Sequence, residues 1–133
     1  GAEILAQPLR EEALHLNQRI DAAMEALDFA GTLETIFQLV RHANRYIEAA
    51  APWQLAKEGH TNRLQGVLGL LAEVIRIVAI LLEPFMPAVS TSIWQQLGLG
   101  QTPRRFTDAA RWPGLPAGQA LGPRRILFPK NFS

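Results

Sequence analysis

The sequence predicts an all-α fold, an antiparallel helical bundle followed by an irregular C-terminal arm. Apolar residues recur at intervals of three and four over four separate stretches, as the buried face of a helix requires. Proline or glycine stands between these stretches, and no apolar/polar alternation continues long enough for a typical strand. Because 133 residues suit a single domain, we expect a bundle over about residues 8–98 and the arm over residues 99–133.

The first two helices are predicted over residues 9–27 and from Asp28 to the proline at position 52. Pro8 suits the first turn of the first helix, where an amide hydrogen is not needed. Asp28 is a typical N-terminal cap for the second helix. Pro52 should end that helix, because its ring has no amide to donate and disfavours a helical conformation in the preceding residue. Trp53 then stands at a corner of the chain.

The third helix is predicted over residues 64–82, with Thr61 or Asn62 as its cap. It is apolar on most sides, so we expect it at the centre of the bundle. Gly66 and Gly69 each cost about 1 kcal/mol of helix propensity relative to alanine, and their presence therefore indicates close packing of another helix.

The fourth helix is predicted to begin near Pro87 and to stop at Gly98. Beyond it the chain is rich in glycine and proline, has no helical period, and reaches a short apolar segment, ILFP, at residues 126–129. We expect Trp94 to lie in the core as part of the fourth helix. Trp112 is expected to anchor the arm.

Composition and charge exclude several classes of protein. A net charge of +1 predicts no strong field over the whole molecule. The arm alone is basic, because against the acid Asp108 it carries Arg104, Arg105, Arg111, Arg124, Arg125 and Lys130. The absence of cysteine excludes disulfides and thiolate metal sites, and is compatible with the cytoplasmic location that we expect. The longest apolar run, residues 67–82, contains Glu73 and Arg76 and is short for a bilayer. We therefore interpret it as a core helix and expect no membrane association.

No catalytic centre is apparent. His15, His42 and His60 lack the spacing of metal ligands, and no glycine-rich phosphate loop is present. Ser90 and Ser92 have no nearby histidine or nucleophile-elbow motif, so we interpret them as cap or surface residues. We expect no metal or cofactor in this chain and no enzymatic activity from it alone.

The corner around Trp53 is the one candidate binding site. Asn44, Arg45 and Lys57 surround it with amide and cationic groups, a setting that suits stacking of an unpaired nucleobase worth about 1–3 kcal/mol. The alternative is that Trp53 packs into the bundle beside Tyr46 and caps the core. On these residues alone, the packing alternative is favoured.

Several motifs then follow one another in a specific order. They are NRYI and APWQLAK within residues 44–57, LLEPFMP, IWQQLG and the closing ILFPKN. Over about residues 9–132, this set resembles the anticodon-binding domain of methionyl-tRNA synthetases, which are class I aminoacyl-tRNA synthetases. The resemblance implies that Trp53 stacks on the first anticodon base, the cytosine of CAU. It also implies that Pro52 fixes the direction of the indole and that Asn44 hydrogen-bonds to anticodon bases.

The resemblance extends to three cations near the corner. Arg41, Arg45 and Lys57 are candidates for contacts with phosphates of the anticodon stem, with ordinary solvated charge as the favoured alternative. For the basic arm, solvated charge is also favoured over packing against the rest of a parent enzyme.

The resemblance further implies that this chain is a fragment of a methionine–tRNA ligase. The HIGH-like and KMSKS-like motifs of the catalytic domain are not in the sequence, and neither is the preceding helix that supplies an Asn and Arg pair for the cytosine in this family. ATP and Mg²⁺ would be cofactors of the parent. The implied partners are methionine tRNA, through its anticodon stem-loop, and the catalytic domain. The alternative is a helical protein-interaction or assembly domain that does not recognise RNA sequence.

Overall fold

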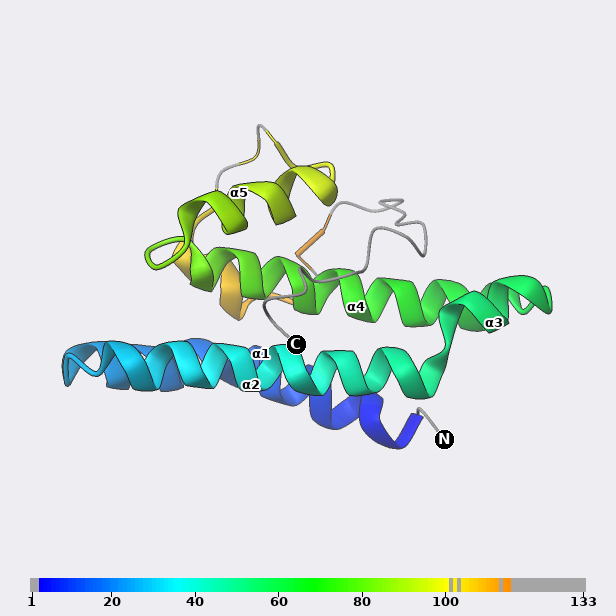
Figure 1. Ribbon diagram of the computed structural model, residues 1–133, viewed down its shortest axis with the longest axis horizontal. Coiled ribbons are helices and arrows are strands. Elements are labelled where there is room, and N and C mark those ends of the chain that lie inside the picture. The colour runs from blue at the N-terminus through cyan, green and yellow to red at the C-terminus, as the bar shows by residue number, and fades with distance from the viewer. Residues whose placement is uncertain (1–2, 101, 103, 113, 116–133) are drawn as a thin grey trace.

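The computed structural model describes residues 3–100, 102, 104–112 and 114–115, and these residues contain helices but no strand. The elements are α1 (Glu3–Glu25), α2 (Phe29–Ala50), α3 (Pro52–Lys57), α4 (Thr61–Leu82), α5 (Pro87–Gln96) and the 3₁₀ helix η1 (Phe106–Ala110) (Figure 1). The all-α bundle predicted from the sequence is confirmed.

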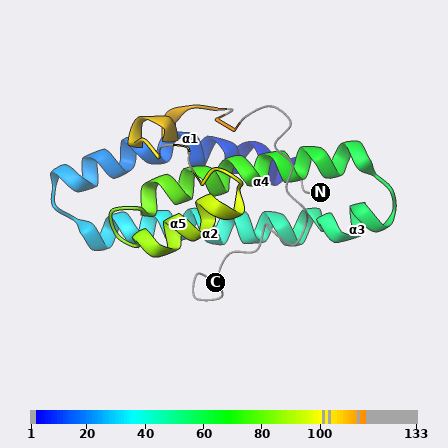
Figure 2. The same ribbon diagram turned by 90° about the horizontal axis from the view of Figure 1, so that it is seen from above.

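The helices form layers around α4. α1 and α2 lie side by side and antiparallel, α4 covers them and runs antiparallel to α2, and α5 lies on the far side of α4 (Figure 1). Seen from above, η1 lies along α1, while α3 lies at the end of the bundle where α2 stops and α4 begins (Figure 2). The corner that carries Trp53 is therefore at one end of the molecule.

α4 is the core helix that the sequence predicts. It packs against each of the other described elements, and every residue from 71 to 82 is buried. By length and composition α4 could cross a membrane, yet 67% of its most apolar window is buried inside the domain. Because the core helix of a globular domain passes the same test, this is weak evidence for a membrane span.

α1 begins earlier than predicted. Its first residue is Glu3, so Pro8 lies inside the helix and not in its first turn. Proline removes one helical hydrogen bond. Leu5 and Ala6 pack against the hydrophobic core on the N-terminal side of Pro8, which accounts for the extra turn.

The end of α2 follows the prediction that Pro52 stops this helix, whereas the short helix α3 that begins at Pro52 was not predicted. Asp28 caps α2, because its Oδ1 accepts a hydrogen bond from the amide of Gly31 at 2.9 Å. α2 stops at Ala50, and Ala51 adopts a left-handed conformation with φ 46°. Pro52 then occupies the first turn of α3, where its missing amide hydrogen costs nothing.

The predictions for the start of α4 are wrong in two respects. The capping position is His60, and Thr61 is already the first helical residue. Gly66 and Gly69 do not mark close packing, because a Cβ atom added at either would meet no described atom within 4 Å. Both glycines are exposed, on the part of α4 that extends beyond the buried core.

α5 and the beginning of the arm also follow the sequence closely. α5 begins at Pro87, and Gly98 stops it in a left-handed conformation with φ 77°. Trp94 lies in the core, as predicted, and its indole Nε1 donates to the carbonyl of Thr102 at 2.8 Å. The described residues of the arm are irregular except for η1, and the ILFP segment at residues 126–129 lies outside the described residues.

Candidate nucleic-acid interface

Trp53 is presented to solvent at the corner between α2 and α3. It is 54% exposed, whereas Pro52 before it is buried and Tyr46 is only 4% exposed. The alternative in which Trp53 packs into the core beside Tyr46 is therefore wrong. A large exposed indole at the end of a bundle is a feature of surfaces that bind other molecules.

The backbone around Trp53 is held in place on both sides. The carbonyl of Ala51 accepts hydrogen bonds from the amides of Gln54 at 2.9 Å and Leu55 at 3.1 Å, so the first turn of α3 closes on the left-handed residue. α3 packs against α4, and Gly59 with φ 77° turns the chain after it. The indole is thus carried by a short, anchored helix.

The α2 residues proposed from the sequence lie on one side of that helix. Arg41 lies three residues before Asn44 and four before Arg45, and Glu48 lies four after Asn44 and three after Arg45, so the four residues share one side of α2. Arg41, Arg45 and Glu48 are exposed and Asn44 is half-buried. Among the described residues no hydrogen bond or ion pair joins this face to Trp53.

The three candidate cations differ in their partners. Arg41 forms an ion pair with Glu34, which lies about two turns earlier on α2, and this pairing partly neutralises it. Arg45 and Lys57 are exposed and have no acidic partner within the described part of the chain. Arg45 and Lys57 are therefore better placed than Arg41 to meet an external anion.

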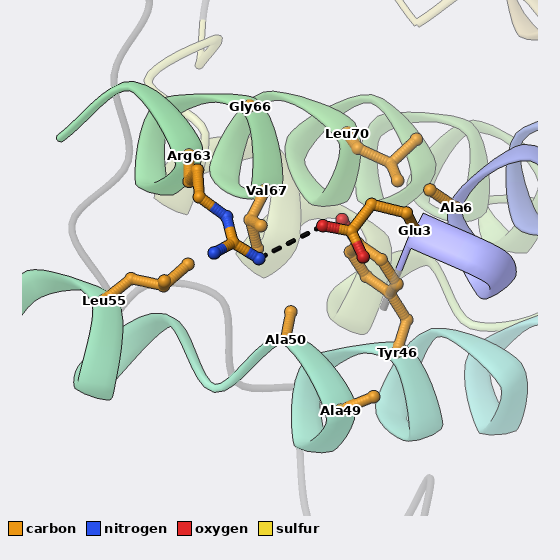
Figure 3. Close-up of a pocket in the computed structure, with 10 residues that line it drawn as sticks. All are labelled: Glu3, Ala6, Tyr46, Ala49, Ala50, Leu55, Arg63, Gly66, Val67 and Leu70. Carbon is orange, nitrogen blue, oxygen red and sulfur yellow. Dashed lines mark hydrogen bonds and ion pairs between the residues drawn. The ribbon is translucent and has the colours of Figure 1, made fainter. Parts of the chain in front are cut away.

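A cavity of about 460 Å³ opens at the same end of the molecule, between the N-terminal parts of α1 and α4 and the C-terminal part of α2 (Figure 3). Glu3 and Arg63 form an ion pair at 3.1 Å inside it. A hydrogen bond from its own backbone and the charge of Arg63 lower the pKa of Glu3. Burial, with a smaller contribution from Glu3, raises the pKa of Tyr46, which also lines the cavity.

Sequence reasoning missed this cavity for two reasons. The first helix was predicted to begin after Glu3, and Gly66 was assigned to helix packing. The sequence nevertheless contained a signal for the cavity, namely small residues in three of the helices. Four of them line the cavity wall: Ala6, Ala49, Ala50 and Gly66.

A buried arginine fixes the first part of the arm. Arg76, only 2% exposed, donates to the carbonyls of Asp108 at 2.8 Å and Arg111 at 2.5 Å and lies 3.5 Å from Glu73. Burial lowers the pKa of Arg76, and the charge of Glu73 opposes that effect. Arg76, whose charge argued against a membrane span, thus holds the described part of the arm at Asp108 and Arg111.

Glu73 completes this anchor. Its two carboxylate oxygens accept hydrogen bonds from the amides of Gly114 at 2.6 Å and Leu115 at 2.7 Å. Nearby, the guanidinium of Arg10 lies 5.1 Å from the centre of the Trp112 ring, a distance at which cation–π attraction contributes. Trp112 therefore anchors the arm, as predicted.

No group of three or more His, Cys, Asp or Glu side chains in the described part of the chain could hold a metal ion. The described residues offer stacking, hydrogen-bonding and cationic groups. An interface for a polar, planar ligand fits them better than a catalytic site does.

Comparison with known proteins identifies one family. Residues 7–123 match the family described as the anticodon-binding domain of tRNA ligase. The chain is 37% identical over 133 residues to a methionine–tRNA ligase of Synechocystis sp., covering 92% of this chain. It is 39% identical over 114 residues, 80% of this chain, to that of Streptomyces coelicolor. With that of Rickettsia typhi it shares 35% identity over 128 residues, 96% of this chain.

The chain spans only part of these relatives, namely 25%, 21% and 25% of their respective lengths. No solved structure matches it.

Proposed function

The chain belongs to the family of anticodon-binding domains of tRNA ligases, and from this premise we propose that it reads the CAU anticodon of methionine tRNA by stacking the first anticodon base on Trp53. The methionine–tRNA ligases that it matches over most of its length support the choice of tRNA. The alternative of a protein-interaction domain indifferent to RNA sequence has no comparable support.

The exposure of Trp53 is the observation that carries this proposal. An indole that is 54% exposed, on a short helix fixed by Pro52 and by hydrogen bonds to Ala51, offers a flat face that is already in place before binding. Pre-organisation reduces the entropy lost when a base stacks on the ring. Stacking itself contributes about 1–3 kcal/mol per base.

The polar residues of α2 would add hydrogen bonds and charge contacts to the stacked anticodon. The amide side chain of Asn44 can both donate and accept, so it can hydrogen-bond to the edge of an unpaired anticodon base. Arg45 and Lys57, which lack acidic partners among the described residues, would contact phosphates of the anticodon stem. Arg41 would contribute less, because Glu34 already pairs with it.

The remaining functions of a methionine–tRNA ligase belong, in this proposal, to parts of a longer enzyme. ATP and Mg²⁺ would bind to its catalytic domain, since no acidic or histidine cluster suited to a metal occurs in the described residues. That domain would be the intramolecular partner of this one, and the cytoplasm, where translation takes place, would be its location. We expect no aminoacylation by this chain alone.

The first prediction concerns charging of methionine tRNA by a full-length ligase that carries this domain. Trp53→Ala should lower kcat/KM by about 5- to 150-fold, because the stacking platform for the first anticodon base is lost and stacking contributes about 1–3 kcal/mol. Phe29→Ala is the matched control, since Phe29 is a comparably exposed aromatic residue, at 50%, at the opposite end of α2. Unchanged charging by the Trp53→Ala enzyme would overturn the proposal.

A further inference from the structure

Gly66 shapes the cavity at the end of the bundle. The predicted role of this glycine in helix packing is not what the structure shows, because a Cβ atom at this position would meet no described atom within 4 Å. It lines the cavity together with Ala6, Ala49 and Ala50, so small side chains from three helices leave the space of about 460 Å³ between them. This volume lies in the range of pockets that bind small organic groups.

The polar groups in the cavity are complementary to a nucleobase edge. Glu3 and Arg63 project toward each other from α1 and α4, 3.1 Å apart, and Tyr46 rises beside Glu3 from α2 (Figure 3). A carboxylate accepts hydrogen bonds and a guanidinium donates them. Adenine and cytosine present an amino donor beside a ring-nitrogen acceptor, whereas uracil has no amino group.

The Glu3–Arg63 pair can be opened by a ligand. Both side chains are mostly exposed, 74% for Glu3 and 64% for Arg63, and exposed pairs contribute little to stability. Val67, Leu70 and Leu55 supply apolar walls for the faces of a ring. The cavity thus combines apolar walls with one acceptor and one donor at its polar side.

α3 connects this cavity to the Trp53 platform. Leu55 of α3 lines the cavity, while Trp53, two residues earlier on the same short helix, is exposed. The bases of an unpaired loop can be splayed apart, so that neighbouring bases occupy different sites. Two neighbouring nucleotides could therefore bind around one helix.

We propose that the cavity is a second base site for the same anticodon loop and takes an amino-bearing base, with Glu3 accepting from the amino group and Arg63 donating to the adjacent ring nitrogen. This inference rests on the proposed function. In CAU, where the first base stacks on Trp53, the base in the cavity is the middle adenine.

The test is an NMR titration of the domain with two anticodon stem-loops, CAU and the same RNA with inosine in place of adenine. Inosine keeps the purine shape but replaces the amino group by a carbonyl. The wild-type domain should bind the CAU stem-loop about tenfold more tightly, the effect of one well-placed pair of hydrogen bonds. Gly66→Leu should fill the cavity and make the two affinities equal.

Gly69→Leu is the matched control. It makes the same change one turn further along α4, at a glycine that does not line the cavity, and should keep the preference for adenine. Arg63→Met is a second variant that removes the donor at an exposed position, and should reduce the preference without unfolding the domain. Thermal unfolding establishes that each variant is folded.

The outcomes separate the two proposals. Equal wild-type affinities for the two RNAs, or an adenine preference that survives both Gly66→Leu and Arg63→Met, would overturn the second base site. The preference for cytosine is measured by titrating a GAU stem-loop beside CAU. If Trp53→Ala abolished that preference, the proposed function would stand without the second base site. A wild-type domain that prefers neither cytosine at the first position nor adenine at the second would overturn both proposals.

Discussion

Ala51 shows how one residue prepares the site. Among the described residues, only Leu27 and Ala51 have a positive φ without being glycine, and such a conformation costs about 1–2 kcal/mol. At Ala51 this strain turns the chain from α2 into Pro52 and the exposed Trp53. Strain of this kind is maintained where the surrounding structure requires the conformation, often next to a functional site.

Leu27 has the same conformation without a comparable role. It ends α1 with φ 58°, and the amides of Leu27 and Asp28 bond to the carbonyls of Met24 and Ala23, the pattern of a Schellman motif. Because Leu27 is 72% exposed, Leu27→Gly should relieve strain at little loss of packing and raise the unfolding free energy by about 0.5–1 kcal/mol. Urea unfolding measures this change. Ala26→Gly, one residue earlier, should instead lower stability, and a loss of stability in Leu27→Gly would contradict the argument.

Tyr46 makes a residue-level prediction about pH. Burial raises its pKa above the ordinary value of 10.0, so its stabilising contribution is complete below about pH 10 and decreases as the pH rises from the unfolded toward the folded pKa. It is the only tyrosine in the chain, so tyrosinate absorbance reports on it alone. The folded domain should titrate at higher pH than the urea-unfolded domain, and Tyr46→Phe should lose less stability above pH 10. Identical titrations in the two states would show that Tyr46 is not buried as described.

At the scale of elements, the helices and boundaries that depend on local sequence patterns could be predicted from the sequence. Apolar periodicity identified α1, α2 and α5 because each buries one stripe, and α4 was identified by its long apolar run. Asp28, Pro52 and Gly98 marked helix boundaries through conformations that only a few residue types favour. The start of α1 was missed because Pro8 also fits a first turn. Whether Gly66 allows packing or leaves a cavity depends on where three helices meet, which periodicity does not contain.

The Glu73–Arg76 pair is the clearest case of information that is not local. Within α4 the two charges appear as interruptions of an apolar run, and only the fold brings the arm backbone to them. Arg76→Met should lower the unfolding free energy by about 3–5 kcal/mol, because it leaves the buried Glu73 unpaired. Arg41→Met, which breaks the exposed pair with Glu34, should cost less than about 1 kcal/mol. Equal losses in urea unfolding would contradict the structural role of the arm anchor.

At the scale of the whole molecule, the low net charge limits how RNA can bind. With a net charge of +1, little affinity is expected from non-specific attraction to phosphates, so in the proposed function selectivity depends on local groups such as Trp53, Asn44 and Arg45. The domain alone should bind weakly, and further contacts made by a parent ligase would add affinity. The exposure of Trp53 could not be predicted from the sequence, because the same residues permit packing or presentation of the ring.

The most direct test of the central claim follows the indole signals of the three tryptophans by NMR during titration with CAU and GAU anticodon stem-loops. Substitution of each tryptophan assigns the signals. We expect CAU to shift the Trp53 signal selectively, while the signals of Trp94 in the core and Trp112 in the arm change little. A Trp53 signal that does not move, or that moves equally with GAU, would contradict recognition of the first anticodon base at this corner.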